Sequence, residues 1–302
     1  MTAAARIDTT LIAGLGLIGG SLARVLRARG FSRRVIGYGH REPSLARGVE
    51  LGVIDSYHLN LAAALAEAEL VVIATPTLVA EDMLERILPQ LRATGSRAVV
   101  TDVASVKGNL QRCAERLWGS MPPRLVLGHP IAGSEQSGVE SSREELFVDH
   151  RVILTPAPDN DADAVQLVRD MWACTGAEVV DMAVADHDAV LAATSHLPHM
   201  LAYALVDALA QSPVSTDIFR FAAGGFRDFT RIASSDPVMW RDIAIANRAA
   251  VLAAMDQFSA HLALLRQAVE REDGDEMLQV FSRAKVARDD FAAKLAARRR
   301  GD

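Results

Sequence analysis

The stretch LIAGLGLIGGSLARVL, residues 11–26, determines the fold class of this 302-residue chain. Three of its glycines have the spacing GxGxxG, between an apolar run typical of a buried strand and a segment with helical periodicity. In such a strand-turn-helix unit, the glycines allow a tight turn, close approach of a pyrophosphate and close packing of the helix. Free N–H groups at the start of the helix then face the anion. The motif therefore predicts a dinucleotide site with contacts from Gly14, Gly16, Leu17, Ile18 and Gly19.

Residues 1–157 continue the pattern that this motif begins. Short apolar runs alternate with longer segments of helical periodicity, which is typical of βαβ units and a parallel sheet. The expected strands are residues 8–13, 34–38, 70–74, 97–102, 125–127 and 151–154. The expected helices are residues 20–29, 43–51, 78–92 and 105–118. The sequence thus predicts an α/β fold that begins with a Rossmann-type, parallel-sheet domain for dinucleotide binding.

Residues 158–302 are expected to form a second, all-helical domain. The segment TPAPDNDADA, residues 155–164, carries two prolines and several acidic residues, as a domain boundary often does. Beyond it alanine, leucine, arginine and glutamate dominate, and no alternating strand pattern follows Val180. The expected helices at 185–211 and 237–271 have more apolar surface than one small domain hides. This domain is therefore predicted to bind substrate and to form a homodimer.

The composition narrows the classes of partner. The formal net charge of −6 and the pI of about 5.8 provide no broad basic field, so nucleic acid is not an expected partner. No run reaches the roughly 20 apolar residues of a transmembrane helix, so a membrane is not expected either. Cys113 and Cys174 lie far apart without a CxxC spacing, which argues against a disulfide framework and favours a reducing, cytoplasmic location.

The end of the second expected strand bears on the choice between NAD and NADP. A site selective for NAD usually has an Asp or Glu there, which binds the ribose hydroxyls. This chain has Gly39, His40 and Arg41 instead. Without the acid a 2′-phosphate is not repelled, and Arg41 is able to pair with it. NAD is thus the expected cofactor and acceptance of NADP is a hypothesis, with a solvated loop charge as the alternative role of Arg41.

Polar residues follow the third and fourth expected strands. The segments are ATPT, residues 74–77, and TDVASVKG, residues 101–108. The carboxyl ends of parallel strands line the ligand crevice of an open sheet. The residues expected beside the nicotinamide half of the cofactor are Thr75, Pro76, Asp102, Ser105 and Lys107. Each is alternatively a turn residue or a helix cap.

Six segments give the chain a resemblance to a known family. They are GLGLIGGS (14–21), ELGVID (50–55), TDVASVK (101–107), GHPIAGSE (128–135), SHLPHM (195–200) and GGFRDFTRIASSDPVMWRDI (224–243). In these segments, which follow the family's order over nearly the whole chain, the chain resembles the prephenate dehydrogenases. The resemblance implies NAD(P)-dependent oxidative decarboxylation of prephenate, a cyclohexadienyl acid, to 4-hydroxyphenylpyruvate in tyrosine biosynthesis.

The resemblance also implies roles for single residues. His129 is expected to accept the proton of the substrate hydroxyl, because neutral imidazole titrates near physiological pH. A strand cap is its alternative role. Ser105 is expected to hydrogen-bond the same hydroxyl or to orient His129. Arg231, which matches the family's arginine shortly before a DP pair, is the expected ligand of a substrate carboxylate, and Arg227 is the competing choice.

Further residues are implied to lie near the substrate. His196 and His199 share one helical face and are expected to bind the side-chain keto acid, or else to pack as satisfied histidines between helices. Without a third ligand they predict no metal site. Ser134 and Glu135 are expected to contact the substrate, and Glu135 and Asp228 to pair with arginines at a gate. The remaining histidines, including His187, match no chemical spacing and are expected on the surface or in packing.

Two of the alternative functions are also enzymes and the third belongs to another class. An arogenate or dual cyclohexadienyl dehydrogenase would accept a substrate that has an amino group where prephenate has a keto oxygen. A β-hydroxyacid dehydrogenase normally uses a lysine of its helical domain, whereas none occurs here before Lys285. A non-catalytic dinucleotide sensor or interaction module is disfavoured by the joint presence of His129, Ser105 and Arg231. The length leaves no room for a fused chorismate mutase or ACT domain, so a single activity is predicted.

Overall fold

The computed structural model describes residues 6–133 and 136–300 and divides into two compact units, residues 1–251 and 252–302. The strands are β1 Ile7–Ala13, β2 Ser32–Tyr38, β3 Ser56–His58, β4 Leu70–Ile73, β5 Val99–Asp102, β6 Leu125–Pro130, β7 Arg151–Thr155 and β8 Glu178–Asp181. The helices of the first unit are α1 Leu17–Ala28, α2 Glu42–Glu50, α3 Leu61–Glu67, α4 Thr77–Thr94, α5 Gly108–Trp118, α6 Ala162–Ala173, α7 Val184–Leu191, α8 Leu197–Ala210, α9 Ser215–Arg220, α10 Gly224–Thr230 and α11 Pro237–Ala246. Its short helical turns are η1 Val139–Ser141, η2 Glu144–Phe147, η3 Ala192–His196 and η4 Arg231–Ser234. Helix α12, Arg248–Glu270, crosses the division, and α13, Gly274–Arg300, lies in the second unit.

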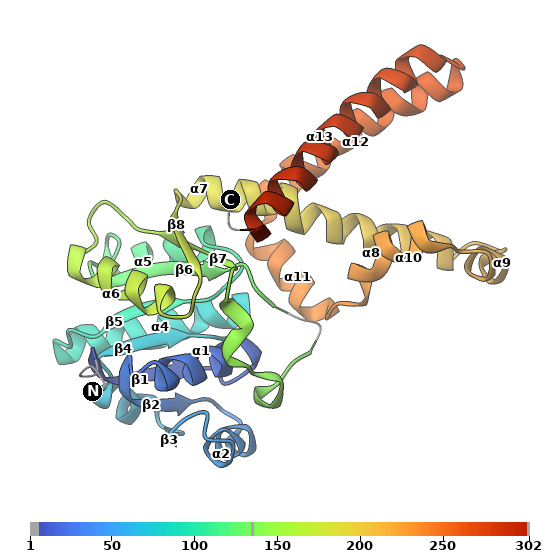
Figure 1. The fold of residues 1–302 in the computed structure, drawn as a ribbon. Coiled ribbons are helices and arrows are strands. Elements are labelled where there is room, and N and C mark those ends of the chain that lie inside the picture. The colour runs from blue at the N-terminus through green and yellow to red at the C-terminus, as the bar shows by residue number, and fades with distance from the viewer. Residues whose placement is uncertain (1–5, 134–135, 301–302) are drawn as a thin grey trace. The chain divides into compact units, whose positions relative to one another are not determined.

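The eight strands form one sheet in the order β3-β2-β1-β4-β5-β6-β7-β8, with helices on both faces (Figure 1). Successive side chains of a strand point to opposite faces, so a strand covered on both sides is apolar throughout. In β4, accordingly, Val71 belongs to the core cluster with Leu84 of α4, and Val72 to the cluster with Leu22 of α1. The strand order reverses between β1 and β4, and ligands bind at the carboxyl ends of the strands beside such a reversal.

The sheet continues past residue 157, where the sequence predicts the dinucleotide-binding domain to end. Strand β8 pairs with β7, and α6 packs against the same sheet through the buried Trp172. Strand β7 runs antiparallel to β6, because the described residues of the segment between them form only the short turns η1 and η2 and no crossover helix. Strand β3 is not among the predicted strands, since three residues carry no measurable alternation.

Two helices that the sequence predicts as continuous are interrupted in the structure. The expected helix at 185–211 contains a π-helical turn, η3, which ends at His196. The expected helix at 237–271 divides into α11 and α12 at Asn247. Pro198 follows the π turn by two residues, whereas no glycine or proline adjoins Asn247. A π turn inside an α-helix frequently marks a functional site.

One helical stretch in the described part of the chain, Val184–Ala210, is long and apolar enough to span a membrane by length and composition. It also carries His187 and His196, whose rings are buried and hydrogen-bonded within the first unit. The stretch is therefore part of the folded framework of the site, and its remaining apolar surface is largely exposed in a single chain.

Candidate active site

The glycine loop between β1 and α1 has the shape that a dinucleotide requires. Gly14 has a φ of +103°, and a Cβ there would lie 2.6 Å from the carbonyl oxygen of Ala74. A Cβ on Gly19 would lie 2.3 Å from the carbonyl oxygen of Gly14, so only glycine permits this approach of α1 to the loop. A Cβ on Gly16 would meet nothing within 4 Å. Open space therefore adjoins the N-terminus of α1, where a pyrophosphate is expected.

The N-terminus of α1 also suits an anion electrostatically. No side chain of the described residues caps it and its first turn has no acid, so the N–H groups at Leu17 and Ile18 are left for a ligand. Thr75, which follows β4, has a buried hydroxyl without a hydrogen-bond partner in the part of the chain that is described. A buried polar atom of this kind is destabilising until a ligand or water satisfies it. The loop and Thr75 thus fit a nicotinamide dinucleotide.

Gly16→Asp is expected to weaken the binding of NAD+ by at least about tenfold while the fold is retained. The backbone at Gly16, with φ −114° and ψ −156°, is extended and suits any residue, and the side chain would enter open space. The new carboxylate would occupy and repel the pyrophosphate. Calorimetric titration with NAD+ measures the affinity, thermal unfolding checks the fold, and Gly16→Ala is the uncharged control. Unchanged affinity in Gly16→Asp would show that the pyrophosphate lies elsewhere.

The residues predicted to bear on NADP lie in solvent. His40 and Arg41 are both exposed just beyond the carboxyl end of β2, and Arg41 stands at the N-cap position of α2. The next residue, Glu42, accepts a hydrogen bond of 3.0 Å from the hydroxyl of Tyr57. His40 and Arg41 thus have the exposure at the strand end that the predicted contact requires.

Asp102 has a different role from the predicted contact with the cofactor. Its carboxylate forms an ion pair with Lys107, and neither side chain is exposed at all. The carboxylate also accepts hydrogen bonds from the N–H groups of Ala104, at 2.9 Å, and Gly128, at 3.1 Å. A side chain without exposed surface cannot contact the nicotinamide ring, so Asp102 belongs to the framework of the site. Pro76, by contrast, is exposed at the start of α4.

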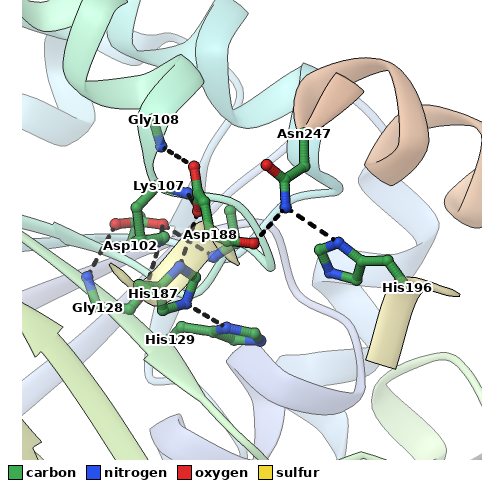
Figure 2. Close-up of polar contacts among 10 residues, drawn as sticks. Asp102, Lys107, Gly108, Gly128, His129, His187, Asp188, His196 and Asn247 are labelled. Carbon is green, nitrogen blue, oxygen red and sulfur yellow. Dashed lines mark hydrogen bonds and ion pairs between the residues drawn. The ribbon is translucent and has the colours of Figure 1, made fainter. Parts of the chain in front are cut away.

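Three residues form a hydrogen-bonded series, which we call the His-His-Asp chain, at the carboxyl end of β6 (Figure 2). Nδ1 of His129 lies 2.9 Å from Nε2 of His187, and Nδ1 of His187 lies 2.8 Å from Oδ1 of Asp188. An ionised carboxylate only accepts hydrogen bonds, so Nδ1 of His187 carries a proton and its Nε2 accepts from Nδ1 of His129. Nε2 of His129 keeps a lone pair, as a general base requires.

The N-terminus of α5 holds Asp188 as an anion. The N–H groups of Lys107 and Gly108 donate to its two carboxylate oxygens at 3.0 and 2.8 Å. Burial raises the pKa of the Asp188 carboxyl, but the hydrogen bonds from His187 and from these N–H groups outweigh it and hold the pKa below its usual value. His187 is therefore a fully buried packing residue rather than a surface residue, and it also joins His129 to this anion through hydrogen bonds.

The imidazole of His129 is held in its neutral form. Burial is the main cause. The positive charge of Lys107, and the charges that His187 and His196 would carry when protonated, act in the same direction, so that the pKa of His129 lies well below 6.5. At neutral pH the ring is thus ready to accept a proton. The hydrogen bond to His187 and the lowered pKa both suit the predicted base, and the role of His129 stays a prediction.

His196 and His199 pack against Trp240 of α11. The ring of His199 stacks on the indole with centroids 3.5 Å apart, and the ring of His196 meets it edge-on at 6.1 Å. Nδ2 of Asn247 donates to the carbonyl oxygen of Asp188 at 2.8 Å and lies 3.2 Å from Nδ1 of His196. Asn247 thereby links this helical wall to the His-His-Asp chain. Neither histidine belongs to a cluster of three or more metal-ligating residues among those described.

Acid is expected to destabilise the protein through His196, because burial lowers its pKa to about 4. An unfolded histidine titrates near 6.5, so below that pH the unfolded chain binds a proton that the folded chain excludes. Stability is complete above pH 6.5 and decreases from there toward pH 4. Between pH 7 and pH 5 this one group should cost about 2 kcal/mol of the free energy of unfolding. Urea unfolding at both pH values measures the loss, which should be smaller in His196→Asn; an equal loss in both proteins would contradict the assignment.

Arg231 lies at the start of η4, close enough to His199 for its charge to act on that ring. Burial lowers the pKa of His199, and the positive charge of the exposed Arg231 lowers it further. Arg227 instead pairs with Asp228 at 3.2 Å, and both of these side chains are largely exposed. Of the two arginines, Arg231 is the one whose charge lowers the pKa of His199, and we retain it as the predicted carboxylate ligand.

Three predicted substrate residues stay predictions. Ser105 is half-buried in the turn between β5 and α5 and makes no hydrogen bond to His129 or to any other residue that the structure describes. Ser134 and Glu135 lie outside the described residues, and the predicted gate pair of Glu135 does so with them.

Sequence reasoning missed Asp188 and Asn247 as well as His187. The adjacent letters HD at 187–188 were the one available signal, since a carboxylate next to a histidine often orients its ring. Asn247 gave no signal, because a single polar residue in a helical pattern is ordinary. Each takes its role from contacts with residues distant in sequence, such as the 2.8 Å bond from Asn247 to Asp188.

The glycine loop at the strand reversal and the neutral histidine at the same edge of the sheet place the chain among the NAD-dependent oxidoreductases. Family models described as prephenate dehydrogenase, nucleotide-binding domain, and prephenate dehydrogenase, dimerization domain, match residues 22–181 and 183–283. The chain therefore belongs to the prephenate dehydrogenase family. The two models meet just after β8, where the sheet ends.

Individual relatives agree with this membership. A prephenate dehydrogenase of Bacillus subtilis is 38% identical, with 93% of this chain and 76% of that protein covered. A cyclohexadienyl dehydrogenase of Zymomonas mobilis is 36% identical, with 92% and 94% covered. The crystal structure of prephenate dehydrogenase from Aquifex aeolicus in complex with hydroxyphenyl propionate and NAD+ has a TM-score of 0.86 at 38% identity, with 94% and 98% covered.

Proposed function

We propose that this chain oxidises prephenate to 4-hydroxyphenylpyruvate and carbon dioxide, with reduction of NAD+ to NADH, as a step of tyrosine biosynthesis. The observation that carries the proposal is the His-His-Asp chain, which presents a neutral Nε2 of His129 at the same sheet edge as the glycine loop. The names of the relatives support prephenate as the substrate.

The reaction breaks a C–H, an O–H and a C–C bond of the substrate. When bound, NAD+ supplies the acceptor for the hydride that leaves carbon 4 of the ring. Nε2 of His129 takes the proton of the 4-hydroxyl as the carbonyl develops. The electron pair of the C–C bond enters the ring as carbon dioxide leaves, and the resulting phenolate takes the proton back. No proton is gained or lost overall, and formation of the aromatic ring makes the reaction essentially irreversible.

His187 and Asp188 support His129 while it holds the proton. The imidazolium keeps its Nδ1–H bond to His187, whose other nitrogen donates to the anion of Asp188. This series fixes the orientation of the ring and stabilises the temporary charge, as the carboxylate of a catalytic triad does. Burial keeps the charged form unfavourable, so His129 readily returns the proton to the phenolate.

The wall made by α8, η4 and α11 suits the carboxylates of the substrate. Prephenate has one carboxylate on the ring and one on its side chain. We assign one of them to Arg231, because a planar guanidinium offers two parallel donors to a carboxylate. The charge of Arg231 lowers the pKa of His199. His199 and the neighbouring His196 supply the remaining polar surface of the wall.

One assay tests the function and the choice of cofactor together. Purified protein is supplied with prephenate or arogenate, each with NAD+ or NADP+, and formation of the reduced cofactor and of 4-hydroxyphenylpyruvate or tyrosine is measured. Prephenate with NAD+ is expected to give the highest kcat/KM. A protein that binds NAD+ but turns over neither substrate would retain the fold and lose the proposed function.

NADP+ is expected to support turnover as well. The residues after β2 are His40 and Arg41, both exposed, at the place where NAD-selective sites have an acid. An arginine there is able to pair with the 2′-phosphate. A preference for NAD+ of about a thousandfold in kcat/KM would exclude this role of Arg41.

The protein is expected to be a homodimer formed through its helical region. Seven large apolar side chains among the described residues of α12 and α13 are more than half exposed in a single chain: Leu262, Leu264, Val269, Leu278, Phe281, Val286 and Phe291. Exposed apolar surface of this extent marks an interface with another chain. Light scattering at micromolar concentration should give about 65 kDa, twice the 32.4 kDa of one chain. A mass of one chain at that concentration would contradict the proposal.

A further inference from the structure

Lys107 is a fully buried cation that has no role in the proposed reaction. Its Nζ pairs with the carboxylate of Asp102 and donates a hydrogen bond of 2.6 Å to the carbonyl oxygen of Gly128. Burial lowers the pKa of Lys107, and the charge of Asp102 opposes this. Replacement of a buried ion pair by apolar residues of similar volume is often neutral or stabilising. Stability alone is therefore a weak reason for this pair.

The ion pair of Asp102 and Lys107 lies just beyond the last paired residues of β5 and β6. The ladder between β5 and β6 stops at Thr101 and Val126. Beyond it, the N–H of Gly128 donates to Oδ1 of Asp102 at 3.1 Å, while the carbonyl oxygen of Gly128 accepts from Lys107. The two side chains thus replace the missing rung. The carbonyl that Lys107 holds belongs to the peptide bond that leads directly into the catalytic histidine.

The backbone of Lys107 holds the opposite end of the same system. Its N–H donates to Oδ1 of Asp188 at 3.0 Å, and that oxygen also contacts Nδ1 of His187. In Figure 2, Lys107 lies beside both Asp102 and Asp188. Both ends of the His-His-Asp chain are therefore attached to one residue, through its side chain at Gly128 and through its backbone at Asp188.

We propose that Lys107, together with Asp102, is a positioning residue: it sets the separation of His129 from the His187-Asp188 pair and so keeps the base correctly oriented. The inference rests on the proposed function. A displacement of about 1 Å in a reacting group lowers rates about a hundredfold, so such a clamp has a measurable effect on kcat. The positive charge of Lys107 adds to this, because it opposes protonation of His129.

The test compares two variants that leave no unpaired buried charge. Asp102→Asn keeps an amine at position 107, which burial allows to become neutral and which still donates to Gly128. Asp102→Asn with Lys107→Met removes that donor and retains the side-chain volume. The matched control is Asp8→Asn with Arg33→Met, which removes an exposed ion pair at the amino ends of β1 and β2. NAD+ affinity and thermal unfolding confirm that each variant is folded.

The double variant at 102 and 107 is expected to lose at least about tenfold in kcat, with the KM for prephenate within about threefold of wild type. Its acidic limb of kcat/KM should move to higher pH, because His129 loses a neighbouring cation. The control should keep kcat within about threefold, and Asp102→Asn, which retains the donor at position 107, should lose clearly less kcat than the double variant. A double variant with wild-type kcat and an unmoved acidic limb would overturn the proposal, as would an equal loss of kcat in Asp102→Asn. Absence of NADH formation by the wild type would instead remove the proposed function itself.

Discussion

Replacement of His129 by alanine is expected to lower kcat for NADH formation from prephenate by about 10²- to 10⁴-fold, the usual contribution of a general base. We propose the imidazole as the base because its pKa is held well below 6.5 and its Nδ1 is engaged with His187, which leaves Nε2 unprotonated. Steady-state kinetics at saturating NAD+ measure kcat, and titration with NAD+ confirms that the cofactor still binds.

Two further variants separate loss of the base from loss of structure. Alanine would leave Nε2 of His187 buried without its partner, whereas His129→Asn can still donate to that nitrogen and cannot accept the substrate proton. Both variants should therefore lose kcat to a similar extent. His150→Ala, at an exposed position, is the control. In the wild type kcat/KM should fall only when the pH drops well below 6.5, since the base is lost on protonation. Retention of kcat in His129→Asn would exclude His129 as the base.

Arg231→Met is expected to lower kcat/KM for prephenate by about a hundredfold, mainly through a higher KM. A charge-assisted hydrogen bond contributes roughly 1.5 to 3 kcal/mol, and a bidentate arginine makes two of them to one carboxylate. Methionine retains much of the length and apolar stem of the side chain but offers no donor. Kinetics with varied prephenate at saturating NAD+ measure the effect, and the KM for NAD+ should stay within about threefold.

Arg227→Met provides the matched comparison on the preceding turn. Arg227 pairs with Asp228 in an exposed position, so its replacement should change kcat/KM by less than about threefold. If Arg227→Met raised the KM for prephenate and Arg231→Met did not, the carboxylate ligand would be Arg227 and our assignment would be wrong. Circular dichroism and NAD+ binding of both variants show whether the fold is intact.

The sequence by itself determined the dinucleotide half of the fold, because its signals are local. Three needs arise within six residues: a positive φ at Gly14, open space at Gly16 and a close approach of the helix to the loop at Gly19. Each of these needs favours glycine at its position. Strands such as β4 and β5 are buried on both faces and are apolar enough to be predicted from the sequence alone. Strand β3, with three residues, and the late strand β8 were missed, since neither has a period long enough to detect.

The family-like segments of the sequence likewise indicate His129, His196 and His199, and the structure places the last two together against Trp240. What only the tertiary structure decided is how the base is controlled. His129 and His187 are 58 residues apart, and their contact exists only because β6 and α7 meet at one edge of the sheet. Asp102 shows the same limit: a carboxylate after a strand looks like a ligand residue in the sequence. Burial and pairing with Lys107 make it framework instead, because both properties depend on what surrounds a group in space.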